Sequence, residues 1–408
     1  MIAGLGRYAG AGIGPILGAG GQFALSLLLL TRLSLGDFGR FSFLIVVSQF
    51  AIGLWSALFG APMLVAAAQG QGVAAIDAAQ RAALLPLAGA MLLLGLATGA
   101  GGVAAILFAL FTALLLARQF ARTRAMAHGV PARAIASDLI YGATLAIGCA
   151  VVLARPTLSL GGAVLPLLLA VVPALWPLRA SVLGGVRGLG GYRAIWRRDS
   201  RWSLLGVLST EGTVNSHSYI VTALYGATAF APIAAAALLI RPITVAINAL
   251  VEFERARFAR DLAEGRIDRV RAGRRQLHAV LFAVWAGTAV VAVLLLTFAP
   301  ELLFRGKFTL PVIALGAALW FAVALARQLH APEGALLLAA GRFRELASIS
   351  IGTAALSLGG VAAGLALGGP IWSIAGIVAG EGAYALILQR RASRFLARHR
   401  PLVGGTAA

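Results

Sequence analysis

The residues of this sequence best able to bind a ligand are the few ionisable side chains inside long apolar runs. Arg241 follows Leu239 and Ile240, and Arg327 and His330 share a second run. Charged groups are costly in a bilayer and usually mark a ligand or ion pathway. The planar guanidinium fits phosphate oxygens, so these residues predict an anion-binding cavity.

Structural pairing is the alternative for both arginines. Arg241 could pair with Glu211 or Glu252, and Arg327 could pair with Glu333 or Glu381 or reach the membrane interface. Carboxylates in such positions either neutralise a cation or couple an ion to transport. Three are therefore candidates for a coupling or a structural role: Glu211, Glu252 and Glu381.

A polar face is expected further along the chain, where Asn215, Ser218 and Thr222 recur at helical spacing. It could line a path for a polar ligand or make hydrogen bonds between helices. His217 could titrate in a proton-coupled cycle, although a single buried histidine is more often structural. Gln22 and Gln49 are expected to face the interior of the first helices, where they could contact the same ligand.

No metal, cofactor or catalytic site is predicted. The single cysteine, Cys149, allows no disulfide framework, and the five histidines show no metal-ligand spacing. An enzyme would need a catalytic carboxylate or a large outer loop, and the predicted outer connections are all short. We therefore expect a protein that binds and moves a ligand without transforming it.

The composition predicts that the ionisable side chains named above lie within helices that cross a membrane. Of 408 residues, 60% are hydrophobic and 12% charged, and the mean hydropathy is +0.91. Such a composition excludes a soluble, disordered or fibrous chain. Because about 20 apolar residues span a bilayer, we predict an all-α membrane protein with twelve transmembrane helices. They are expected near 10–31, 41–68, 82–98, 102–121, 136–154, 162–180, 203–225, 229–252, 277–298, 310–331, 346–367 and 370–389.

The basic residues give the orientation. The chain has 34 Lys+Arg against 14 Asp+Glu, a net charge of +20. Most of the basic residues fall on the side that holds both termini, which the positive-inside rule places in the cytoplasm. The excess serves topology and contact with anionic lipids, so we expect no binding of nucleic acid.

Two six-helix lobes, 1–190 and 191–408, are expected on either side of the basic connection 181–202. The second lobe carries a basic segment, 253–276, and a basic tail. The segment is predicted to form an amphipathic helix on the inner membrane face. It would gather an anionic lipid substrate or anchor the protein to anionic lipids.

The opening stretch Leu30-Thr31-Arg32-Leu33-Ser34-Leu35-Gly36-Asp37-Phe38-Gly39-Arg40-Phe41-Ser42-Phe43 resembles the polysaccharide flippases. These are the Wzx-type O-antigen and exopolysaccharide transporters of the multidrug/oligosaccharidyl-lipid/polysaccharide exporter superfamily. The resemblance implies a multi-pass protein of the bacterial cytoplasmic membrane. It would move a polyprenyl-pyrophosphate-linked oligosaccharide outward by alternating access between two lobes, for lipopolysaccharide or exopolysaccharide synthesis. Its partners would be that lipid-linked substrate, anionic lipids, and a polymerase or other assembly proteins.

A multidrug antiporter of the same superfamily is the alternative. Such exporters commonly bind a coupling cation at an acidic residue buried in the first lobe. Here the first lobe offers Asp37 and Asp77, expected in loops, and Asp138, expected at an inner helix end. This argues against a first-lobe cation site and leaves coupling through Glu211 or Glu381 open. The flippase pattern is also incomplete, since the proline often found after the eighth helix is missing from Val251-Glu252-Phe253-Glu254-Arg255.

Overall fold

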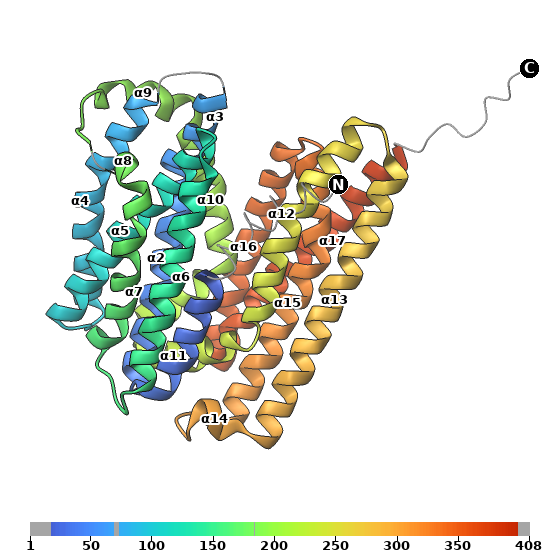
Figure 1. The fold of residues 1–408 in the computed structure, drawn as a ribbon. Coiled ribbons are helices and arrows are strands. Elements are labelled where there is room, and N and C mark those ends of the chain that lie inside the picture. The colour runs from blue at the N-terminus through green and yellow to red at the C-terminus, as the bar shows by residue number, and fades with distance from the viewer. Residues whose placement is uncertain (1–17, 69–72, 183, 399–408) are drawn as a thin grey trace, which may run out of the picture. The chain divides into compact units, whose positions relative to one another are not determined.

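The computed structural model describes residues 18–68, 73–182 and 184–398, and all regular structure in these ranges is helical (Figure 1). The predicted all-α class is confirmed. The chain forms two compact units. Unit 1 comprises the residues up to Glu211 together with Ser218–Ala234, and unit 2 comprises Gly212–His217 and the residues from Ala235 onward. The two units are not contiguous in the sequence, and the predicted lobes 1–190 and 191–408 stay a prediction.

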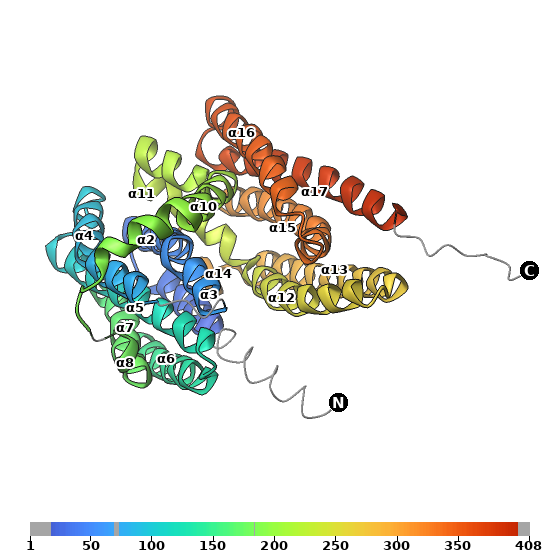
Figure 2. The ribbon, with the colours of Figure 1, turned by 90° about the horizontal axis from the view of Figure 1, so that it is seen from above.

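Unit 1 is a bundle of long apolar helices. It begins with a helical stretch at residues 18–32, and its first hairpin is completed by α2, which Ser34 caps by accepting a hydrogen bond from the Asp37 amide. In Figures 1 and 2, α4 to α7 run side by side. The elements are α2 (Leu35–Trp55), the π-helical turn η1 (Ser56–Gly60), α3 (Ala61–Ala68), α4 (Ala74–Ala97), α5 (Gly102–Ala127), α6 (Pro131–Leu153), α7 (Leu160–Ala174), η2 (Trp176–Leu178), α8 (Arg179–Val182), η3 (Leu189–Gly191), α9 (Tyr192–Ile195), η4 (Trp196–Ser200) and α10 (Arg201–Val214).

Unit 2 is a bundle in which α15 packs against α12, α13 and α17 (Figure 1). Small residues let α16 and α17 approach closely, since a Cβ on Gly376 would lie 2.0 Å from the backbone nitrogen of Val361. The elements are α11 (Ser216–Leu238), most of which packs in unit 1, α12 (Arg241–Ala263), α13 (Ile267–Phe298), α14 (Pro300–Phe304), α15 (Leu310–Ala339), α16 (Phe343–Gly368), η5 (Pro370–Trp372) and α17 (Ser373–Arg398).

Nine helices of the described chain are long and apolar enough to cross a membrane, or ten if the bent pair α7 and η2–α8 is one span. Twelve were predicted. Only residues 18–31 of the first predicted span, 10–31, are described, and the seventh and eighth spans are interrupted. The chain is a multi-pass membrane protein.

The predicted seventh and eighth spans are both broken helices. The seventh is split at Asn215, between α10 and α11, where φ is −119° and ψ is 1°. Gly226 forms the expected turn between the two spans with φ 80° and ψ 167°, a conformation that glycine adopts readily. The eighth is interrupted at Leu239 and Ile240, and Arg241 is the first residue of α12. Hydropathy predicted two continuous helices here.

Segment 253–276 is a helical hairpin rather than a single surface helix. It consists of the end of α12, a turn at 264–266 and the start of α13. Phe258 and Val270, expected on its apolar face, are fully buried against Leu336 and Leu396. One face of the hairpin therefore packs against the core of unit 2, and its other residues are largely exposed.

The first helical hairpin contacts the turn at Gly226 within unit 1. A Cβ on Gly39 of α2 would lie 2.0 Å from the carbonyl oxygen of Ala227, so the two backbones touch. Phe43, one turn further along α2, packs edge-on against the rings of Tyr219 and Phe230. This contact joins the start of α2 to the turn at Gly226.

Candidate functional site

Two clusters of buried or partly buried ionisable side chains in unit 2 include residues of α15. Glu381 of α17 is 4% exposed and binds two groups of α15. Its Oε1 accepts from Arg327 Nε at 3.1 Å, and its Oε2 lies 2.8 Å from His330 Nε2. The ring of Tyr384 covers the histidine edge-on at 4.8 Å. Of the roles open to Arg327, the structure therefore shows the ion pair with Glu381.

A second cluster of the same composition lies one turn further along α15. Glu333 is completely buried, and its Oε1 accepts from Arg274 Nε at 3.1 Å and lies 2.9 Å from His278 Nε2. Its Oε2 accepts no hydrogen bond from the described residues. Because His330 and Glu333 are three residues apart, they follow one face of the helix. Thus His330 of α15 pairs with a carboxylate of α17, and Glu333 of α15 pairs with an imidazole of α13.

The second cluster was missed in the sequence. Glu333 was considered only as a partner for Arg327, and Arg274 was counted with the topogenic arginines. The spacing of Arg274 and His278, four residues apart at the start of an apolar run, was the available signal.

Arg241 stands apart from these pairs. It is the first residue of α12, directly after the break at Leu239–Ile240, and it is partly buried. Within the described ranges no ion pair or hydrogen bond involves it. Of the partners expected for Arg241, Glu211 belongs to unit 1, and the side chain of Glu252 lies outside the described residues. The amino-terminal end of α12 adds a partial positive charge at the same place.

The residues around Asn215 are separated by the helix break. Asn215 is the N-cap of α11, so it does not continue a helical face through Ser218 and Thr222 as expected. His217 is 2% exposed and packs edge-on against Trp320, with ring centroids 5.3 Å apart. Glu211, in unit 1, accepts a hydrogen bond from the Tyr219 hydroxyl.

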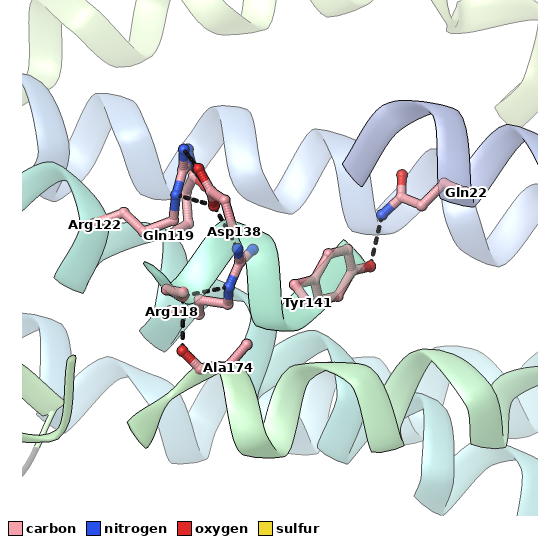
Figure 3. A network of polar contacts seen from close by, with 8 residues as sticks. Gln22, Arg118, Gln119, Arg122, Asp138, Tyr141 and Ala174 are labelled. Carbon is pink, nitrogen blue, oxygen red and sulfur yellow. Dashed lines mark hydrogen bonds and ion pairs between the residues drawn. The ribbon is translucent and has the colours of Figure 1, made fainter. Parts of the chain in front are cut away.

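Unit 1 contains a polar network of its own (Figure 3). Asp138 of α6 is held by two arginines of α5, with Arg118 Nη2 at 2.5 Å and Arg122 Nη2 at 2.7 Å. The Arg118 guanidinium also lies over the Tyr141 ring at 4.6 Å. The Tyr141 hydroxyl accepts from Gln22 Nε2 at 3.0 Å.

This network contains two arginines for one carboxylate, and each of these three side chains has a partner within it. Gln22 thus faces the interior of its bundle as expected, whereas Gln49 is exposed. Arg118 and Arg122 had been counted as topogenic arginines of a connecting segment, and the structure places them inside α5.

Solved structures of one transporter superfamily share this fold. An inward-facing multidrug resistance MATE family transporter of the MOP superfamily matches with a TM-score of 0.67 and 12% identity, over 94% of this chain and 96% of its own. An outward-facing structure described in the same words matches with a TM-score of 0.60 and 15% identity, over 96% of both chains.

A MOP superfamily transporter from Pyrococcus furiosus, described as having a binding pocket of reverse polarity that suggests a different function, also matches. Its TM-score is 0.60 and its identity 13%, over 97% of this chain and 96% of its own. No protein-family model and no curated protein matches the sequence. At these identities the likeness establishes the fold.

Proposed function

We propose that this protein translocates a polyprenyl-pyrophosphate-linked oligosaccharide across the bacterial cytoplasmic membrane, by alternating access, for surface polysaccharide synthesis. The observation that carries the proposal is Arg241. It is a guanidinium within a predicted span, at a helix break, with no partner among the described residues. A pyrophosphate is the kind of ligand that such a group recognises, because the guanidinium donates two parallel hydrogen bonds to phosphate oxygens.

The broken helices support the same function. Transporters commonly form their substrate sites from interrupted membrane helices, whose amino-terminal ends face anionic groups of the substrate. Here α12 begins at such an interruption and presents Arg241 in its first turn. A cationic side chain and a positive helix end coincide, which favours an anionic cargo.

Three aspartates of unit 1 favour an anionic cargo over a cation coupled at these positions. Asp37, Asp77 and Asp138 each form an ion pair with at least one arginine of the described chain. A cation site there would first require these pairs to open. The Pyrococcus furiosus transporter, whose binding pocket of reverse polarity is described as suggesting a different function, shares this fold.

A multidrug antiporter is the second candidate function, and the clusters along α15 are the observation that favours it. Glu381 with His330, and Glu333 with His278, each pair a buried carboxylate with a partly buried imidazole. Chains of such groups serve as proton relays in transporters. Proton exchange would also be compatible with a flippase, so the cargo must be identified directly.

A lipid extraction from bacteria lacking the gene tests the proposal. We expect a polyprenyl-pyrophosphate oligosaccharide to accumulate while surface polysaccharide is lost. A plasmid copy should reverse both effects, and a copy with Arg241→Ala should not. Normal lipid-linked intermediates together with increased sensitivity to cationic drugs would reject the flippase and favour the antiporter.

A further inference from the structure

A cleft between the inner ends of α13 and α17 is not used by the proposed function. It has a volume of about 530 Å³, within the range of small-molecule sites. Both helices belong to unit 2. The lining residues are Arg271, Arg274, Arg275, Ser393, Leu396 and Ala397.

The charge of this cleft is strongly positive. Its three arginines lie on one face of α13, and only part of their charge is neutralised. Arg271 pairs with Asp268, whose side chain is 82% exposed, and it also donates to the Leu396 carbonyl across the cleft at 3.1 Å. Arg274 is bound to Glu333. Arg275 is exposed and has no ion pair or hydrogen bond within the described ranges.

The opposite wall combines one hydroxyl with apolar surface. Ser393 is exposed and makes no hydrogen bond to the described residues, while Leu396 is buried and Ala397 exposed beside it. Such a wall offers a donor for an anion and a surface for hydrocarbon.

The sequence of α13 places the cleft at the depth of lipid headgroups. The helix has 32 residues, more than the roughly 20 that cross the hydrocarbon core. After His278, residues 279–298 contain no ionisable side chain, and the three arginines precede this apolar part by about two turns or less. On α17, Arg390, Arg391 and Arg394 likewise follow the apolar part. Anionic headgroups attract arginines at this level.

We propose that this cleft binds the phosphate headgroup of an acidic phospholipid. Arg275 and Arg271 would donate to the phosphate oxygens, Ser393 would donate from its hydroxyl, and the first methylenes of the lipid would contact Leu396. The apolar wall and the depth of the site favour a lipid over a soluble phosphate ion. The inference does not depend on the cargo, because lipid binding in this cleft does not involve Arg241 and leaves Arg274 paired with Glu333.

Thermal unfolding of the full chain in a neutral detergent tests the site. Phosphatidylglycerol is titrated, and phosphatidylcholine and inorganic phosphate are titrated in parallel. We expect phosphatidylglycerol alone to raise the unfolding temperature at micromolar concentrations. Arg275→Gln should weaken its apparent affinity about fivefold, the equivalent of about 1 kcal/mol for one arginine near an anionic surface.

Two further variants separate a defined site from diffuse attraction. Ser393→Phe fills the cleft and keeps every charge, so it should abolish the stabilisation. Arg269→Gln removes an exposed arginine of the same helix that does not line the cleft, and it should leave the affinity unchanged. The unfolding temperature without lipid verifies that each variant folds.

Three results would overturn the proposal. An equal loss of affinity in Arg269→Gln would show general charge attraction, and an unchanged affinity in Ser393→Phe would show that the cleft is not occupied. Stabilisation by inorganic phosphate at the same concentrations would identify a soluble anion as the ligand.

Discussion

Arg327 and Glu381 form an ion pair between α15 and α17, with Nε and Oε1 3.1 Å apart and the two residues 54 positions apart in the sequence. The carboxylate is almost inaccessible, with a side-chain exposure of 5%, and that of the arginine is 21%. Breaking a buried pair leaves an uncompensated charge, whereas removing both members costs far less.

The first prediction concerns this pair. Arg327→Met or Glu381→Leu alone should lower the free energy of unfolding by about 3–5 kcal/mol, because each leaves its partner charged and buried. The double variant should be markedly less destabilised than the sum of the two. Thermal or denaturant unfolding of the purified proteins measures both quantities, and strictly additive effects would show that the two groups do not interact.

Arg327→Lys is the variant that separates stability from transport. It retains the charge opposite Glu381 and loses the planar fork. If Arg327 acts only through the ion pair, surface polysaccharide should stay near normal in cells that carry it.

The second prediction concerns Arg241. Arg241→Ala should reduce surface polysaccharide about tenfold or more without lowering the protein level, because a lost charge-assisted contact to phosphate is worth about 1.5–3 kcal/mol. Arg241→Lys should retain part of the activity, since it keeps the charge but not the two parallel hydrogen bonds.

Arg187→Ala is the matched control, since Arg187 is exposed in the segment between α8 and η3. Polysaccharide should be normal in that strain. Normal polysaccharide in Arg241→Ala as well would reject Arg241 as a cargo ligand.

The third prediction concerns the backbone contact at Gly39. A methyl group at this position would overlap the Ala227 carbonyl, so Gly39→Ala should lower the free energy of unfolding by about 1–3 kcal/mol. Gly89→Ala in α4 is the control, because a Cβ there meets no atom within 4 Å. Alanine in an exposed helix position should stabilise by up to about 1 kcal/mol. Equal unfolding temperatures for the two variants would contradict the close approach.

The fourth prediction concerns the network of unit 1. Asp138→Asn removes the carboxylate shared by Arg118 and Arg122, and it should destabilise the protein by about 3 kcal/mol or more. Asp199→Asn removes a carboxylate whose arginine partner has a half-exposed side chain, so it should cost less than about 1 kcal/mol. A similar unfolding temperature for both variants would show that the buried network contributes no more than a surface pair.

Most of the helices could be predicted from hydropathy, because a long apolar run is visible in the sequence without knowledge of the segments that pack against it. Helices α5 and α15 cover the predicted spans and extend them by more than a turn, while α6 and α16 agree with theirs to within five residues at each end. The breaks at Asn215 and at Leu239–Ile240 could not be found this way, since apolar residues mask an interruption of the backbone. Pro242, the second residue of α12, was the available signal for the second break.

The sequence predicted which residue types form the candidate site, but it did not predict which of them pair with one another. The sequence identified Arg327, His330 and Glu381, and it offered the Glu381 pair as one of several roles. It could not choose among them, because α15 and α17 meet only in the folded bundle. Gln49 shows the same limit, since its exposure depends on how α2 is rotated against its neighbours.

The pairing of α15 with α17 has a consequence for biogenesis. Isolated helices with an arginine near their centre insert poorly into the bilayer. During synthesis, Arg327 enters the membrane while Glu381 is still 54 residues from being made, a delay of several seconds at about 5–20 residues per second. Until Glu381 is made, another protein or helix must stabilise Arg327 in the membrane, such as the translocation machinery, a chaperone or the preceding helix α13. Its final position in the membrane is therefore settled only when the last helix of the described chain arrives.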